Sequence, residues 1–278
     1  MGGVRQAEPG IWVRIALTIA GSDSGGGAGI QADLKTFHQF GAFGTSVIVA
    51  ITAQNTVGVT AVHAVPVETV EAQMAALAAD LPPHATKTGM LATSDLVRAV
   101  AAGIQRHGFG NYVLDPVMVA TSGYRLLSRD AERTVATALV PLATLVTPNL
   151  EEAGILVEAE VRTPDQMAQA GRALVRMGAQ AALVKGGHLA GDELADVLVT
   201  RDGARRFTHA RIDTTSVHGT GCTLSSAVTA GLALGRPLER AVEDALDFVH
   251  RAIRAAPGLG TGHGPLNHFV EAPRVGGG

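Results

Sequence analysis

The segment 218–222 has the sequence HGTGC and lies directly before an apolar run, 223–234, that has the composition of a helix. Backbone amides at the start of a helix have no acceptor within the helix, so they can bind an anion such as a phosphate. Cys222 ends the segment, and a thiol at a helix N-terminus is expected to have a lowered pKa. Such a loop can hold a phosphoryl group and take a proton from its acceptor. We therefore predict a kinase, although a lone cysteine is most often an inert apolar residue.

A second glycine-rich segment, 21–29, has the sequence GSDSGGGAG and follows the first predicted strand. Ligands bind at this carboxyl end of the strands in open parallel sheets, and glycines let a ligand approach the backbone closely. The overlapping run 27–32, GAGIQA, also matches the pattern of dinucleotide-binding dehydrogenases. Two observations count against a dehydrogenase: the loop is too long for that tight turn, and the predicted strand 46–52 does not end in an acid. The P-loop motif is absent.

Four polar residues stand next to the ends of predicted strands. Asp115 ends a buried strand, where it could face a ligand or cap the turn before Pro116. Asn149 and Glu152 could hold Mg²⁺ through water, or could form a capping box at the start of a helix. Lys185 ends another apolar strand. Because an unpaired buried ammonium is costly, we expect Lys185 to bind a phosphate.

Two further polar residues could bind a polar substrate. Asp33 falls on the first turns of the following helix, where it could be a surface or capping group or could bond a polar substrate. Gln54 lies in a polar stretch, 52–60, between β-branched residues. Its amide offers one donor and one acceptor side by side, which match the ring nitrogen and amino group of a pyrimidine.

The composition excludes several other classes of protein. The 278 residues carry a net charge of −3, and no lysine or arginine cluster follows a helix, so we expect no nucleic acid partner. A single cysteine excludes an internal disulfide framework and indicates a reducing compartment. No signal peptide or membrane span is evident, so we expect a soluble, cytoplasmic protein.

Short apolar runs alternate with longer amphipathic runs along the chain. We predict strands at 14–20, 46–52, 85–88, 111–115, 145–146 and 181–185, and helices at 30–40, 67–79, 94–107, 130–139, 150–156, 164–177, 223–234 and 238–255. Such alternation is typical of a mostly parallel sheet with helices on both faces. Two strands at 193–200 and 205–213 flank an Asp-Gly turn and predict an antiparallel edge. We expect an α/β fold in one domain, 1–278, with a small β flap at 52–60 and flexible tails at 1–10 and 275–278.

Taken together, these segments resemble the bacterial hydroxymethylpyrimidine/phosphomethylpyrimidine kinases of thiamine biosynthesis, in the ribokinase-like superfamily. The resemblance is carried by segments at 16–21, 29–36, 87–90, 184–188 and 218–223, which span nearly the whole chain. It implies a three-layer α/β/α sandwich and two successive phosphorylations that use ATP and Mg²⁺. It also implies a small-molecule pyrimidine substrate and a homodimer.

The resemblance implies roles for individual residues as well. The implied substrate-binding residues are Gly21, Ala28, Asp33, Thr52, Gln54 and Met90. The implied catalytic residues are Gly219, Thr220, Gly221, Cys222 and Lys185, of which Thr220, Gly221 and Lys185 also bind ATP. Asn149 and Glu152 match the magnesium motif of the superfamily, and we add Asp115 as a metal candidate. Cys222 takes the place of the aspartate base that much of the superfamily has.

Two other interpretations remain at this point. Pyridoxal kinases share both glycine-rich loops, and the flap sequence at 54–56 favours the pyrimidine over pyridoxal. The second interpretation is a non-catalytic protein with this fold that binds a nucleotide or a vitamin. The presence of Lys185, Glu152 and Cys222 together counts against it.

Overall fold

The computed structural model describes residues 13–119, 123, 127–187, 189 and 193–273. Nine strands form one sheet in the order β3-β2-β1-β4-β5-β6-β7-β8-β9. The strands are β1 (Ile15–Asp23), β2 (Phe43–Gln54), β3 (Val59–Ala64), β4 (Ala85–Thr88), β5 (Tyr112–Leu114), β6 (Leu145–Val146), β7 (Ala181–Val184), β8 (Glu193–Val199) and β9 (Ala204–Ala210). The strands from β2 to β7 in this order are parallel, whereas β3, β8 and β9 pair antiparallel with their neighbours.

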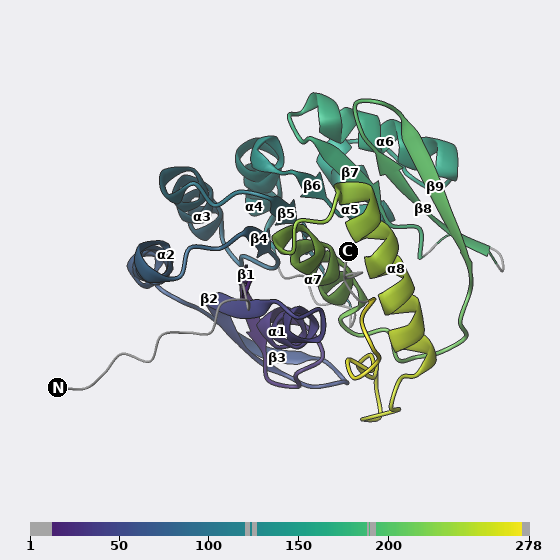
Figure 1. The fold of residues 1–278 in the computed structure, drawn as a ribbon, viewed down its shortest axis with the longest axis horizontal. Coiled ribbons are helices and arrows are strands. Elements are labelled where there is room, and N and C mark those ends of the chain that lie inside the picture. The colour runs from purple at the N-terminus through teal and green to yellow at the C-terminus, as the bar shows by residue number, and fades with distance from the viewer. Residues whose placement is uncertain (1–12, 120–122, 124–126, 188, 190–192, 274–278) are drawn as a thin grey trace.

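Helices cover both faces of the sheet (Figure 1). They are α1 (Gly29–Gln39), α2 (Val67–Asp80), α3 (Ser94–His107), α4 (Arg129–Thr134), α5 (Leu150–Val157), α6 (Pro164–Arg176), α7 (Thr220–Ala233) and α8 (Leu238–Arg254). A π-helical turn (Val135–Leu139) and a 3-10 turn (Val140–Leu142) follow α4. Helices α1, α7 and α8 lie on one face, and α2 to α6 lie on the other. The molecule is therefore a three-layer α/β/α sandwich.

Strand periodicity determines which side chains meet each helical layer. In β1, Leu17 and Ile19 point into the core under α2 and α3, whereas Ala16 belongs to the core under α7 and α8. Successive strand residues point to opposite faces of a sheet. Small residues such as Ala85 and Ala181 continue the second face. Their small size lets α7 pack close to the sheet. Helix α7 begins beside the carboxyl ends of the strands.

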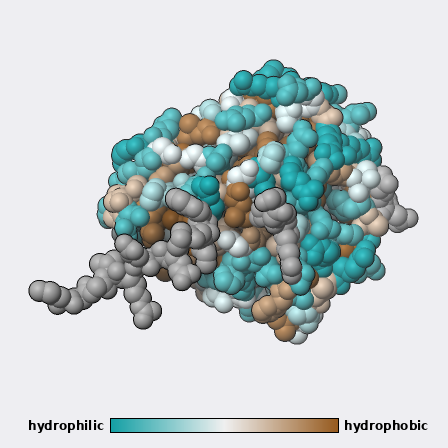
Figure 2. Space-filling model, viewed as in Figure 1, coloured by the Kyte–Doolittle hydropathy of each residue, from teal (hydrophilic) through white to brown (hydrophobic). Residues whose placement is uncertain are grey.

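The described surface fits a protein whose apolar residues are mostly inside. Hydrophilic residues cover most of the face shown in Figure 2, and apolar residues there form separate small groups. Among the described residues, no helix combines the length and the apolar character that crossing a bilayer requires.

The predicted fold class and the antiparallel edge at β8 and β9 are confirmed. The predicted flap at 52–60 is a hairpin at the edge of the main sheet, where β2 continues to Gln54 and β3 pairs antiparallel with it. Two local predictions were wrong. Helix α7 begins at Thr220, three residues earlier than predicted. The run 130–139 changes from an α-helix to a π-helical turn. The predicted tails, 1–10 and 275–278, lie outside the described residues.

Candidate active site

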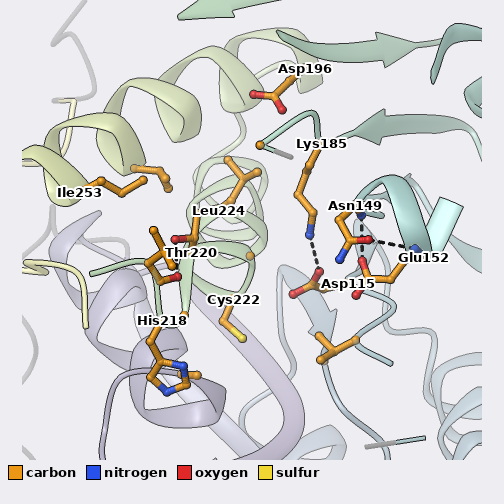
Figure 3. A pocket seen from close by; sticks show the side chains of 18 of the residues that line it. Asp115, Asn149, Glu152, Lys185, Asp196, His218, Thr220, Cys222, Leu224 and Ile253 are labelled. Atoms are coloured by element: carbon orange, nitrogen blue, oxygen red, sulfur yellow. Dashed lines mark hydrogen bonds and ion pairs between the residues drawn. The ribbon is translucent and has the colours of Figure 1, made fainter. Parts of the chain in front are cut away.

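A cavity of about 870 Å³ runs along the carboxyl ends of β1, β4, β5 and β7 and continues between β9 and α8. The start of α7 forms part of its wall. In Figure 3, the side chains of Lys185, Asp115 and Cys222 converge near this start. Loops from distant parts of the sequence therefore meet in one cavity, as expected at the carboxyl ends of parallel strands.

The two glycine-rich segments pack directly against each other. Gly219 adopts a left-handed φ of 83° immediately before α7, and a Cβ there would lie 1.8 Å from the carbonyl oxygen of Gly27. A Cβ at Gly27 would lie 2.5 Å from the ring of His218. Only glycines allow this approach. The amides of Gly221 and Cys222 lie in the first turn of α7, where helices have no internal acceptors.

Lys185 lies beside the start of α7 and is paired with a carboxylate. Its Nζ is 3.1 Å from Asp115 Oδ1, and a Cβ on Gly221 would lie 3.1 Å from the same nitrogen. Burial lowers the pKa of Lys185, but the nearby carboxylates of Asp115 and Glu152 outweigh burial and raise it above its usual value. Asp115 therefore already offsets the cost of burying this ammonium, and the expected contact between Lys185 and a phosphate stays a prediction. Lys185 is still 15% exposed and faces the cavity, so it can also meet an anion.

Asp115 accepts hydrogen bonds from three side chains. Besides Lys185, these are the hydroxyls of Thr147 at 3.3 Å and Ser225 at 3.2 Å. Its side chain is 1% exposed but borders the cavity. Asp115 therefore connects β5, the end of β6, the end of β7 and α7 at one point.

Asn149 and Glu152 form the capping box at the start of α5. The Asn149 amide donates to Glu152 Oε2 at 2.8 Å, and the Glu152 amide donates to Asn149 Oδ1 at 2.9 Å. Burial raises the pKa of Glu152 to about 7, with Lys185 acting against this shift and Asp115 adding to it. Both residues line the cavity. Within the described ranges, no three His, Cys, Asp or Glu side chains form a group that could hold a metal ion by themselves.

Cys222 lies in the cavity wall and is partly exposed. Burial raises the pKa of its thiol to about 11, although Lys87 acts in the opposite direction and the Gly29 amide also favours the thiolate. The expectation of a lowered pKa was therefore wrong. The cause is that desolvation of the thiolate outweighs the nearby amides and cation.

The predicted substrate side of the cavity contains most of its expected residues. Gly21, Ala28, Thr52, Gln54 and Met90 all line it. The Gln54 amide lies between two polar groups, with Oε1 3.2 Å from Thr52 Oγ1 and Nε2 3.3 Å from His218 Nε2. A Cβ on Gly21 would lie 2.5 Å from Met90 Cε. These residues form a narrow slot at the end of β1 and β2.

Asp33 is the exception among the predicted substrate-binding residues. Its side chain is fully buried and is paired with Lys87, whose Nζ lies 2.6 Å away. It does not belong to the residues that line the cavity. Direct contact between Asp33 and a substrate is therefore not supported, because α1 turns this carboxylate into the interior beneath the cavity wall.

Two residues that the sequence interpretation did not single out organise the substrate side. Asp23 accepts from the amides of Gly25 at 2.8 Å, Gly27 at 3.0 Å and Ala28 at 2.8 Å. It also lies 2.9 Å from Nε2 of His218. Burial works against ionisation of Asp23, but the bonds from His218 and the loop amides hold its pKa below its usual value. An acid two residues before the glycines at 25–27 was the available signal.

The far end of the cavity, between β9 and α8, was also not predicted. Its walls include Phe207 and His209 from β9 and Leu246, His250 and Ile253 from α8. The mixture of apolar and ring side chains suits a flat heterocycle. No sequence motif marks this groove, because its residues come from two elements that become neighbours only through folding.

A helix start with free amides beside a cavity lysine, together with a polar slot and a groove lined by apolar and ring side chains, is the arrangement expected of small-molecule kinases. The phosphomethylpyrimidine kinase family model matches residues 23–267. The chain belongs to this family, and it is therefore a phosphotransferase.

Known relatives agree with this assignment over most of the chain. A hydroxymethylpyrimidine/phosphomethylpyrimidine kinase of Rhizobium meliloti is 52% identical over 258 residues, covering 92% of this chain and 97% of the relative. The crystal structure of a phosphomethylpyrimidine kinase from Clostridium difficile has a TM-score of 0.78 at 40% identity, covering 86% and 99% of the two chains. An ADP complex of Bacillus subtilis pyridoxal kinase has a TM-score of 0.86 at 38% identity, covering 92% and 97%.

Proposed function

We propose that the protein transfers the γ-phosphoryl group of ATP to 4-amino-5-hydroxymethyl-2-methylpyrimidine, and then to the resulting monophosphate, in thiamine biosynthesis. The observation that carries the proposal is that Lys185, the start of α7 and the Gln54 slot border one continuous cavity. Phosphoryl transfer depends mainly on positioning and charge stabilisation. A cation and free amides between two ligand slots provide both.

In this proposal ATP spans the groove and the start of α7. The heterocycle of ATP lies between β9 and α8, and its phosphates reach the amides of Gly221 and Cys222 beside Lys185. Thr220 fixes the loop, because its hydroxyl donates to the Val217 carbonyl at 2.7 Å. The Gly219 turn directs the first amides of α7 at the cavity. Charge that develops on the transferred group is thereby met by fixed donors.

The residues around Glu152 fit a role in holding Mg²⁺ through water. Magnesium keeps several waters and binds through few carboxylates. Glu152 and Asp115 provide two carboxylates at the cavity, and the raised pKa of Glu152 means that a nearby cation would favour its ionised form. Asn149 holds Glu152 in place through the capping box. When bound, the ion would neutralise charge on the ATP phosphates.

In the first phosphorylation, Cys222 takes the proton from the hydroxymethyl group. This role is supported by the position of the thiol in the first turn of α7, in the wall of the cavity that Gln54 also lines. Because the pKa of the thiol is high, little thiolate is present at neutral pH, and nearby cations are needed to stabilise it. The second phosphorylation requires less help, because its acceptor is already an anionic phosphate.

Pyridoxal phosphorylation is the second candidate function. It is favoured by the similarity to the Bacillus subtilis pyridoxal kinase structure. Gln54, with its donor and acceptor beside Thr52 and His218, fits the amino and ring-nitrogen edge of the pyrimidine better. An ATP-consumption assay with the pyrimidine alcohol, its monophosphate, pyridoxal, pyridoxine and pyridoxamine tests the choice. We expect the highest kcat/KM with the two pyrimidines, and a preference for pyridoxal would reject the proposal.

Assembly as a homodimer, implied by the family resemblance, and a cytoplasmic location, expected from the composition, stay predictions. The exposed apolar side chains of Phe43, Ile51 and Val62 on β2 and β3 support a contact between copies. Sedimentation of the purified protein measures the oligomeric state. A monomer at micromolar concentration would contradict this part of the proposal.

A further inference from the structure

A buried ion pair lies at the cavity wall. Lys87 in β4 and Asp33 in α1 are 2.6 Å apart, and both side chains are 0% exposed. A buried ion pair seldom stabilises a fold more than apolar side chains of similar size would. Stability alone therefore gives little reason for charges at this place. Lys87 borders the same cavity as Cys222, whereas Asp33 does not.

Asp33 ties the ion pair to α7, the helix that carries Cys222. It accepts from the hydroxyls of Thr18 and Ser226, each at 2.6 Å. Ser226 lies about one turn after Cys222 in α7. Asp33 is the one hydrogen-bond acceptor of Lys87 among the described residues. The ammonium of Lys87 is therefore fixed beside this helix.

Charged groups from four elements face Cys222. Lys87 comes from β4, Asp33 from α1, Asp115 from the end of β5 and Lys185 from the end of β7. The Gly29 amide at the start of α1 also donates toward the thiol. Lys87 has the strongest effect on the thiol after burial, and this effect favours the thiolate, whereas Asp33 and Asp115 oppose it.

We propose that Lys87 is a positioning residue that acts through Cys222: its ammonium, anchored by Asp33, stabilises the thiolate during proton transfer. The inference rests on the proposed function for its reaction. The thiolate takes the hydroxymethyl proton as the oxygen forms its bond to the γ-phosphorus of ATP. The bond from that phosphorus to the bridging oxygen breaks, and ADP leaves with the electron pair. The Cys222 thiol then returns its proton to water.

The thiol can be titrated directly, because Cys222 is the only cysteine of the chain. The rate of alkylation by iodoacetamide follows the thiolate fraction and does not depend on catalysis. It is measured from pH 6 to pH 11 on the full chain without nucleotide. For Lys87→Met we expect alkylation about tenfold slower at pH 8, because a rise of one pKa unit lowers the thiolate fraction tenfold.

Asp33→Asn should have the opposite effect, because it removes the carboxylate that offsets Lys87. We expect faster alkylation at pH 8. Thr88→Val is the matched control, since the Thr88 hydroxyl is buried in the same strand but bonds to Tyr112. Its alkylation profile should equal that of the wild type. Damage to packing alone would not give opposite shifts for the two partners of one ion pair.

The proposal is overturned if Lys87→Met leaves the profile unchanged, or if Lys87→Met and Asp33→Asn shift it in the same direction. Should Lys87→Met not fold, the double variant Lys87→Met/Asp33→Asn, which removes both charges of the pair, takes its place. It should still alkylate more slowly than the wild type, and an equal or faster rate would reject the proposal. A wild type that titrates as expected but does not phosphorylate the pyrimidine would instead refute only the proposed function.

The kinetic counterpart is the pH profile of kcat/KM for the first phosphorylation. We expect the pKa of the basic group in this profile to be higher in Lys87→Met than in the wild type, by the same amount as the pKa from the alkylation profile. A fall in rate at every pH without a shift would show a structural role only and would contradict the inference.

Discussion

Gly221 in α7 faces the ammonium of Lys185 across a gap that a Cβ would fill tightly. A Cβ at residue 221 would lie 3.1 Å from Lys185 Nζ and 3.8 Å from both carboxylate oxygens of Asp115. The helix start and the cation that are proposed to hold the ATP phosphates are therefore close neighbours. Their spacing sets how closely a phosphate can approach both.

Gly221→Ala is expected to displace Lys185 while α7 stays intact. A misplacement of about 1 Å in an active site can reduce the rate about 100-fold, and a Cβ 3.1 Å from Lys185 Nζ requires a smaller shift, so we expect kcat to fall about tenfold. Steady-state assays with varied ATP measure it. Gly203→Ala is the control, because a Cβ there meets no atom within 4 Å. Equal kcat in the two variants would mean that this contact has no role in catalysis.

The raised pKa of Glu152 predicts a pH dependence of stability. Burial raises this pKa from 4.5 to about 7, so the folded protein binds more protons than the unfolded chain between these values. The contribution of Glu152 to stability is therefore largest below pH 4.5 and is lost as the pH rises through 7. Glu152→Gln keeps a side-chain acceptor for the capping box and removes the titration.

Urea unfolding at pH 5 and pH 8 tests this dependence. Relative to Glu152→Gln, the wild type should lose about 2–3 kcal/mol of the free energy of unfolding over this interval. A parallel change in the two proteins would show that Glu152 has an ordinary pKa in the fold.

Gln54→Ala should weaken binding of the pyrimidine by about 1–3 kcal/mol, because its partners in the slot lose a hydrogen bond. Isothermal titration calorimetry with the pyrimidine alcohol measures the change. Thr60→Ala is a neighbouring control, since its exposed hydroxyl donates to the Ala53 carbonyl outside the cavity lining. If Gln54→Ala binds as tightly as Thr60→Ala, Gln54 does not contact the substrate.

Cys222→Ser should slow the first phosphorylation much more than the second. A hydroxyl is a far weaker base than a thiolate, while the phosphate acceptor of the second step is already ionised. Single-turnover quench experiments with each pyrimidine separate the two steps. Equal slowing of both would count against Cys222 as the proton acceptor.

The sequence was sufficient to predict residues whose position follows from strand ends and glycines. Lys185, Asp115 and the 218–222 segment each follow or precede a recognisable element, so their convergence could be expected from a parallel sheet. The Asn149 and Glu152 pattern predicted both a capping box and a metal motif, and the capping box is present.

Other features depend on packing between distant residues. Asp23 and His218 are 195 positions apart, and no local pattern indicates their contact. The burial of Asp33 beneath the cavity wall depends on how α1 packs against β1 and α7. The thiol of Cys222 has a raised pKa because tertiary packing removes water, which outweighs the helix position that the sequence shows.

The central claim is that one cavity phosphorylates the pyrimidine alcohol twice at the start of α7. Phosphorus NMR of a single reaction with ATP, Mg²⁺ and the pyrimidine alcohol tests it most directly. The account predicts that the monophosphate appears first and is then converted to the diphosphate, while ADP accumulates. A reaction that yields no pyrimidine phosphate, under conditions in which pyridoxal is phosphorylated, would contradict it.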